Sequence, residues 1–388
     1  MDNTKLTLIK LIKSGLTGEN LGPIDIADFD ELVNIAAAHQ ILMTLYYGVL
    51  NSKVDIPEDR FLSLKNASLK LLFIGKNQLF ELNRIFDALG AENIPFVPLK
   101  GTVLKDLYPT PEMRHMTDAD IFIRTEQLDK IASVMEKLGY EYKYDSDHET
   151  VYSLSDKLAV EFHKRLIPSY NNDFYKYYEN YWDRLDPQNP ILSDEDQFIY
   201  CLAHLAKHYR DGGAGIKYLI DIYVILKKQN INLDYVFDEL RKLQLDTFAK
   251  NIFKTVNVWF EGEESDEITE LITEKVFSSG AYGKKSDKTI AAAYKKTATQ
   301  NENRNTLRFK KLLIFFFPPF SAMAEKYPFL KKIPILLPLT WILRFIKVLF
   351  NGRIKYLKPS VKSFKISTAE NISEYERELR AVGLDFNF

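Results

Sequence analysis

Apolar residues recur every three or four positions along most of the chain, a spacing that predicts amphipathic helices. This pattern covers residues 4–90, where the longest run extends from Phe61 to Leu89 and stops at Gly90, and it returns between 170 and 300. Residues 91–168 differ, because their apolar runs are short and several alternate with polar residues, which predicts β-strands. The sequence therefore predicts an α+β fold, with a small mixed sheet embedded between helical N-terminal and C-terminal regions.

The pattern also predicts how the chain is divided. We expect an N-terminal helical region over 1–90, a sheet-containing core over 91–168, a second helical domain over 169–300, and a basic, apolar C-terminal region over 301–388. A chain of 388 residues is long enough for two or three domains with a large buried core.

The predicted sheet carries a pair of carboxylates. Asp118 and Asp120 begin an apolar strand and are two residues apart, so their side chains share a face. Two carboxylates this close repel each other unless a proton or a cation lies between them. Mg²⁺ suits such an all-oxygen site. An isolated Asp-x-Asp is more often a solvated strand edge, so the neighbouring features decide between the two interpretations.

Two neighbouring features favour a site. Lys100-Gly101-Thr102 follows an apolar strand and opens a short helix, and backbone N–H groups at such a turn favour phosphate. A third acid, Glu161, lies in an alternating segment that has the pattern of a central strand. His163 shares its face and is expected either to hydrogen-bond a carboxylate or to contact substrate.

The chain resembles the polymerase-β-type nucleotidyltransferase superfamily in three features taken together. These are Gly101-Thr102 at the turn, Asp118-x-Asp120 on the next strand, and a single acid, Glu161, on a later strand. More closely, PLKG…YP…R…TDADIFI…LGY…VEFH resembles a family of uncharacterised bacterial nucleotidyltransferases often encoded with polysaccharide-biosynthesis genes. The resemblance spans roughly residues 30–350, and its specific part is 95–165. The superfamily usually has Gly-Ser at the turn, and threonine keeps the hydroxyl.

The resemblance implies a small nucleotidyltransferase sheet and a magnesium-dependent, ATP-binding type of activity. A nucleoside monophosphate would pass from a nucleoside triphosphate to an unidentified hydroxyl or phosphate acceptor, in surface polysaccharide biosynthesis. Catalysis and the binding of two Mg²⁺ ions would fall to Asp118, Asp120 and Glu161. Gly101 and Thr102 would hold the phosphates, and residues 169–300 would close the nucleotide cleft.

Other cations are candidates for nucleotide contact, and each has an ordinary structural alternative. Lys100 and Arg114 could face the phosphates, since Arg114 lies just before the Asp-x-Asp strand. Lys217 could do the same, but a helical ion pair with Asp221 four residues later is an equal interpretation. On the preceding helix, His204 and His208 are spaced as in a zinc site or could face phosphate or acceptor.

Two alternative functions use the same residues. In the first, the acids serve a kinase-like phosphoryl transferase that attacks the γ- rather than the α-phosphorus. In the second, the protein is a non-catalytic nucleotide-binding scaffold at a membrane-associated assembly. The product released from the triphosphate would separate the first alternative from nucleotidyl transfer.

Composition and charge add the cellular context. The single cysteine, Cys201, excludes an internal disulfide, and the N-terminus lacks a secretory pattern, so we expect a cytoplasmic protein. Fourteen Lys or Arg and one acid, Glu325, lie between Arg304 and Lys365, whereas the remainder holds 38 basic and 52 acidic residues. Residues 310–358 are also strongly apolar, which disfavours nucleic acid as a partner. They could make a peripheral contact with the inner face of the membrane or pack on the acidic part of the chain.

Overall fold

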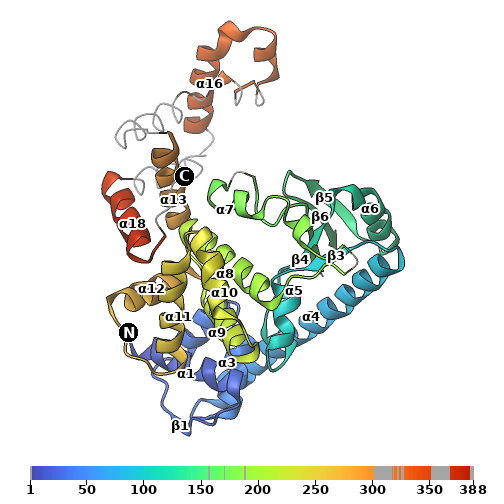
Figure 1. Ribbon diagram of the computed structural model, residues 1–388. Coiled ribbons are helices and arrows are strands. Elements are labelled where there is room, and N and C mark those ends of the chain that lie inside the picture. The colour runs from blue at the N-terminus through green and yellow to red at the C-terminus, as the bar shows by residue number, and fades with distance from the viewer. Residues whose placement is uncertain are drawn as a thin grey trace. The chain divides into compact units, whose positions relative to one another are not determined.

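The structure is a computed structural model that describes residues 2–155, 158–169, 171–187, 189–300, 317, 319–320, 323–324, 327–350 and 368–384. The chain forms two compact units (Figure 1). The first comprises Met1–Tyr209, Gly213–Gly283 and Val382–Phe386, and the second consists mainly of Lys284–Ala381. The first unit contains the sheet and all the predicted site residues.

The N-terminal region is helical, as its apolar spacing predicts. Its helices are α1 (Asn3–Thr17), α2 (Phe29–Ala38), α3 (Leu42–Asn51) and α4 (Glu58–Ala91). Two short parallel strands, β1 (Pro23–Ile24) and β2 (Lys53–Val54), were not expected from the pattern. Helix α4 also differs from the prediction, because it passes through Gly90. The left-handed residue after it is Asn93, with φ of 52°, and the N–H of Ile94 returns to the carbonyl of Leu89.

Helices α1 and α3 pack so closely that glycine is required where they cross. A Cβ on Gly48 would lie 1.9 Å from the carbonyl oxygen of Leu11, and one on Gly15 would lie 2.2 Å from that of Thr44. Both obstacles are backbone atoms, which cannot rotate away. Ser14 and Asn51 add hydrogen bonds between the same two helices.

We therefore expect Gly48→Ala to lower the free energy of unfolding by about 1–3 kcal/mol, the usual cost of overpacking, although alanine favours helix formation. Urea unfolding of the full chain measures the change. Gly90→Ala is the matched control, because Gly90 lies in a helix with open space around its Cβ position. Equal stability of Gly48→Ala and the parent protein would contradict the close packing.

The sheet has five strands in the order β3-β4-β7-β6-β5. They are β3 (Phe96–Pro98), β4 (Asp118–Ile123), β5 (Glu141–Asp145), β6 (Glu149–Leu154) and β7 (Leu158–His163). Strands β5, β6 and β7 form an antiparallel meander, whereas β4 and β7 are parallel. The prediction of an α+β protein with a small mixed sheet is confirmed.

The two faces of the central strands carry different chemistry. On one face, Ala119, Ile121 and Ile123 of β4 join Val160 and Phe162 of β7 in a core with residues of α4 and α6 (Leu128–Lys137). On the other face, the alternate positions hold Asp118 and Asp120 of β4 and Glu161 and His163 of β7. The alternation of side chains along each strand thus separates the packing face from the polar face.

Helices cover much of the rest of the first unit. They are α7 (Asn172–Tyr178), α8 (Asp194–Arg210), α9 (Ile216–Lys228), α10 (Leu233–Lys242), α11 (Asp246–Phe260) and α12 (Glu267–Ser279). The 3₁₀ turns and α5 (Gly101–Leu104) connect β3 to β4. His39, buried at the end of α2, hydrogen-bonds the backbone of Ile216 and Phe277 and so joins α2 to α9 and α12.

The second unit contains α13 (Lys285–Gln300), α16 (Leu337–Phe350) and α18 (Ala369–Ala381). Met323, Ala324, Tyr327 and Leu330 form a small core against which Trp341 packs. Ile335, Leu339 and Ile342 remain largely exposed. None of the helices within the described ranges is long and apolar enough to cross a membrane. Of the predicted lipid-contacting stretch, residues 310–316, 318, 321–322, 325–326 and 351–358 lie outside the described residues.

Candidate active site

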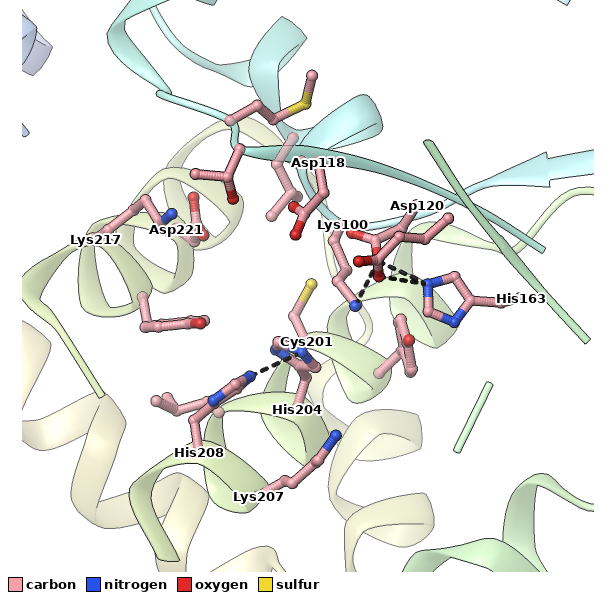
Figure 2. A pocket seen from close by; sticks show the side chains of 18 of the residues that line it. Lys100, Asp118, Asp120, His163, Cys201, His204, Lys207, His208, Lys217 and Asp221 are labelled. Carbon is pink, nitrogen blue, oxygen red and sulfur yellow. Dashed lines mark hydrogen bonds and ion pairs between the residues drawn. The ribbon is translucent and has the colours of Figure 1, made fainter. Parts of the chain in front are cut away.

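A cavity of about 310 Å³ lies between the polar face of the sheet and helices α8 and α9 (Figure 2). Its wall includes all three predicted acids, Asp118, Asp120 and Glu161, together with Lys100 and Gly101. The residues from the strands and those from α8 face each other across this space. Lys100 and Glu161, which are 61 positions apart in the sequence, thus line the same cavity.

Parallel pairing of β4 and β7 sets the spacing of the acids. Asp120 lies directly opposite Glu161, and Asp118 is one pleat repeat away on the same face. Burial, together with Asp120 and Asp118, raises the pKa of Glu161 to about 8. Burial and Asp120 likewise raise the pKa of Asp118. The three carboxyl groups therefore cannot all be ionised at neutral pH unless a cation compensates their charge.

Lys100 supplies part of that compensation. Its ammonium lies 2.8 Å from Oδ1 of Asp120 (Figure 2). Burial lowers the pKa of Lys100, but attraction to Asp120 outweighs it and keeps this pKa well above its usual value. The Lys100 backbone has φ of 49° and ψ of −115°, a conformation that residues other than glycine rarely adopt. The side chain of this residue lines the cavity.

Gly101 lies at the start of the helix that follows β3, as predicted, and its phosphate contact stays a prediction. The left-handed residue of the turn is Lys100, and Gly101 begins α5. A Cβ on Gly101 would lie 2.7 Å from Nη1 of Arg114 and 2.8 Å from Cγ of Met116. Glycine is needed here because these side chains pass close to the backbone.

His163 fixes the other side of Asp120. Its Nε2 lies 2.7 Å from Oδ1 of Asp120 and 3.6 Å from Oε2 of Glu161, and its Nδ1 lies 3.1 Å from Nε2 of His148. Because a carboxylate can only accept, Nε2 of His163 donates the bond to Asp120. Burial raises the pKa of Asp120, but Lys100 and His163 outweigh it and hold this pKa well below its usual range.

Arg114 lines the cavity but is engaged by Asp221. The guanidinium donates from Nε to Oδ1 at 2.8 Å and from Nη2 to Oδ2 at 2.9 Å, and the Tyr108 hydroxyl donates to Oδ1 at 2.7 Å. All three side chains are buried. The predicted pairing of Asp221 with Lys217 is therefore replaced by a bidentate ion pair that ties α9 to the segment before β4.

Two predicted contacts have other partners in this structure. The Thr102 hydroxyl donates to the carbonyl of Leu99 at 2.6 Å, and Thr102 is not among the residues that line the cavity. Lys217 does line it, and its ammonium donates to Oε1 of Gln40 at 2.7 Å. Burial and the nearby Arg114 lower the pKa of Lys217 to about 8. The predicted phosphate contacts of Thr102, Arg114 and Lys217 stay predictions.

Helix α8 supplies the wall opposite the acids (Figure 2). His204 and His208 lie side by side, with their Nε2 atoms 3.1 Å apart, and Tyr218 of α9 stacks on His208. Neither histidine belongs to a cluster of three or more potential metal ligands among the described residues. This wall is aromatic, and Lys207 of α8 and Lys217 of α9 add positive charge, which suits an anionic ligand or a flat ring better than zinc.

The cavity wall also includes His148 and Glu149, which the sequence analysis did not single out. Glu149 pairs with His163 across β6 and β7. A signal was present: counting outward from the turn between these strands, where Leu154 faces Leu158, brings Glu149 opposite His163. Burial and the neighbouring His163 lower the pKa of His148 to about 2.

The donor atoms of the site could hold cations. Among the described residues, Asp120, Glu161 and His163 form one group of closely spaced donor atoms, and His148, Glu149 and His163 form another. The first group contributes two carboxylates and has Asp118 beside it on the same strand. This arrangement of strand carboxylates beside a cationic turn is the chemistry of phosphate and metal binding.

Comparison with known sequences agrees with this chemistry. The sequence model of a family described as uncharacterised nucleotidyltransferase matches residues 25–261, which include the sheet, the cavity and helices α8 and α9. The chain belongs to this family. The predicted family resemblance is confirmed, and the matched segment makes the protein a nucleotidyltransferase by family, which is a class of transferase enzymes.

Comparison with solved structures and with curated proteins adds little to the family assignment. The solution structure of the antibiotic-resistance factor ANT(2'')-Ia matches this nucleotidyltransferase with 11% sequence identity and a TM-score of 0.31, covering 49% of this chain and 100% of that chain. No curated protein matches the sequence.

Proposed function

We propose that this nucleotidyltransferase transfers a nucleoside monophosphate from a nucleoside triphosphate to a hydroxyl or phosphate acceptor in a Mg²⁺-dependent reaction. The observation that carries the proposal is the convergence of Asp118, Asp120 and Glu161 on one cavity wall beside Lys100. The family assignment supports the reaction class.

The residues fit divalent cations. Carboxylate oxygens from two paired strands provide the ligands that Mg²⁺ prefers, and the raised pKa of Glu161, about 8, reflects the carboxylate repulsion that a cation would relieve. Asp118 and Asp120 would hold both ions, and Glu161 would complete the acceptor-side site. Bound there, two cations neutralise charge on the attacking and leaving oxygens of a phosphoryl group.

The side chains have distinct roles in the proposed transfer. An acceptor oxygen attacks the α-phosphorus, the bond from that phosphorus to the β-bridging oxygen breaks, and pyrophosphate leaves. Glu161 receives the proton that the acceptor loses. When the triphosphate binds, the Lys100 ammonium leaves Asp120 and pairs with the triphosphate oxygens, since a lysine ammonium binds phosphate as a point charge. Gly101 keeps the turn close to Arg114, so that Lys100 stays directed into the cavity.

The test compares two labels. Purified protein is incubated with Mg²⁺, a desalted cell extract as acceptor source, and each nucleoside triphosphate labelled at either the α- or the γ-phosphate. We expect the α-label in a new product, together with labelled pyrophosphate from the γ-labelled substrate. Release of nucleoside diphosphate with transfer of the γ-label would replace this proposal by phosphoryl transfer. Nucleotide binding without either product would favour the scaffold function.

The cellular setting is also a proposal. The family resemblance supports a role in surface polysaccharide biosynthesis, with a cytoplasmic location. Within 310–358, the exposed Ile335, Leu339 and Ile342 support a peripheral contact with the membrane, and packing on the acidic part of the chain stays the alternative. The apolar character of this stretch continues to disfavour nucleic acid as a partner.

A further inference from the structure

We propose that His148, Glu149 and His163 form a second metal site, selective for Zn²⁺ over Mg²⁺. The three side chains lie on the cavity wall, on the far side of His163 from the acids. Each presents one donor atom to the others: Nε2 of His148, Nδ1 of His163 and Oε2 of Glu149.

The separations of these atoms match the size of a zinc ion. Nε2 of His148 lies 3.1 Å from Nδ1 of His163, and Oε2 of Glu149 lies 3.7 Å from the first nitrogen and 3.9 Å from the second. A point equidistant from three atoms so placed is about 2.1 Å from each, which is the length of zinc bonds to imidazole nitrogen and carboxylate oxygen. The spacing of the three donor atoms therefore fits a zinc ion.

Outer hydrogen bonds hold two of the ligands in the orientation that a metal requires. His163 donates from Nε2 to Asp120 at 2.7 Å, which leaves its other ring nitrogen, Nδ1, beside Nε2 of His148. The other oxygen of Glu149, Oε1, accepts from the Tyr144 hydroxyl at 2.8 Å. Metal-binding histidines and carboxylates are typically supported in this way.

The donor set determines which ion fits. Two imidazoles and one carboxylate suit Zn²⁺, whereas Mg²⁺ prefers oxygen ligands throughout. Asp118, Asp120 and Glu161 provide the oxygen site, so the two sites meet at His163 and differ in chemistry. His148 and Glu149 are partly accessible, with side-chain exposures of 14% and 18%, which leaves an entry path.

The experiment measures binding of ZnCl₂ alone to the chelator-treated full chain by calorimetry, in the presence of excess Mg²⁺. We expect one tight equivalent. His148→Gln and Glu149→Gln should each raise the dissociation constant for Zn²⁺ at least about tenfold. Tyr144→Phe, which removes the hydrogen bond to Glu149, should raise it by a similar factor. Thermal unfolding verifies that each variant is folded. No nucleotide is used, so the result is independent of the reaction proposed above.

Two control variants keep this inference falsifiable. His204→Gln removes a histidine from the opposite wall, and Asp118→Asn removes an oxygen ligand of the proposed magnesium site. Both should retain the Zn²⁺ equivalent. Loss of that equivalent in either control, or its full retention in His148→Gln, would place the ion elsewhere and overturn the proposal, as would displacement of Zn²⁺ by Mg²⁺.

A separate observation concerns the outer face of α4. We infer that this face binds a second copy of the chain, with the two α4 helices antiparallel. Leu62, Leu69, Phe73 and Phe80 lie on one side of the helix, opposite its buried residues, and are 44%, 47%, 69% and 62% exposed. Exposed aromatic and aliphatic residues aligned in this way mark an interaction surface.

The spacing of these four exposed residues identifies the partner. The intervals between them are seven, four and seven residues, so the spacing is the same in both chain directions. In an antiparallel pair centred on Leu71, Leu62 faces Phe80 of the second copy and Leu69 faces Phe73. The exposed Glu58 then faces Arg84 of the second copy, a half-buried residue that also pairs with Glu81 of its own helix at 2.6 Å, so opposite charges meet at both ends. A two-fold interface requires this self-complementarity.

Light scattering of the full chain after size exclusion tests the inference. We expect a dimer for the parent protein and a monomer for Phe73→Glu, whereas Leu233→Glu, at an exposed leucine of α10, should stay dimeric. Glu58→Arg and Arg84→Glu should each raise the dissociation constant, and the double charge exchange should restore it. A monomeric parent protein, or a dimeric Phe73→Glu, would overturn the inference.

Discussion

Replacing Asp118 and Asp120 together by alanine is expected to abolish Mg²⁺-dependent turnover of the triphosphate. Loss of one preorganised electrostatic stabiliser typically costs about 10²–10³ in rate, so the double change should lower turnover by at least about 10³-fold. The assay is the α-labelled transfer described above. Asp129→Asn, an exposed acid in the first turn of α6, is the matched control and should retain full activity.

The single substitutions separate this role from an effect on folding. Asp118→Asn should stabilise the protein at neutral pH without divalent cations, because the folded state raises the pKa of Asp118 and so disfavours its charged form. Asp120→Asn should destabilise it, because Lys100 and His163 favour the charged form of Asp120. Both should be inactive. Substantial turnover by the double variant would remove these acids from the mechanism.

Asp221→Ala is expected to cause the largest loss of stability among single substitutions around the cavity. It leaves Arg114 buried without its bidentate partner and the Tyr108 hydroxyl without an acceptor. Removing one member of a buried ion pair typically costs about 3–5 kcal/mol. Urea unfolding of the full chain measures the change.

Two comparisons define what the Asp221→Ala result means. Glu92→Ala removes an exposed ion pair with Lys137 and should change stability by less than about 1 kcal/mol. Combining Arg114→Met with Asp221→Leu should recover much of the loss, because apolar side chains carry no desolvation penalty. An Asp221→Ala protein as stable as the Glu92→Ala control would show that the ion pair contributes little to folding.

Local patterns were sufficient to predict the elements of the site. Side-chain alternation placed Asp118 beside Asp120 and Glu161 beside His163, and helical spacing placed Lys217 and Asp221 on one helix, which is α9. These predictions succeed because each depends on residues a few positions apart. The α+β class follows from the same local patterns, since only the central region has strand-like periodicity.

Contacts between distant segments could not be predicted in the same way. Nothing local to Asp221 indicates that its partner is Arg114, 107 positions earlier, rather than the nearby Lys217. The sequence also could not show that β4 and β7 pair in parallel or that Lys100, rather than Gly101, adopts the left-handed conformation. These features depend on how packed elements approach one another, which a single sequence does not encode in its periodicity.

The parallel pairing of β4 with β7 has a practical consequence. A chain cut at Thr125, in the exposed connection after β4, gives one piece with Lys100, Asp118 and Asp120 and another with Glu161 and the α8 wall. Neither piece holds a complete set of acids. Turnover would therefore report the reunion of the two pieces, and fusing each to one of two interacting proteins would convert the enzyme into a complementation sensor.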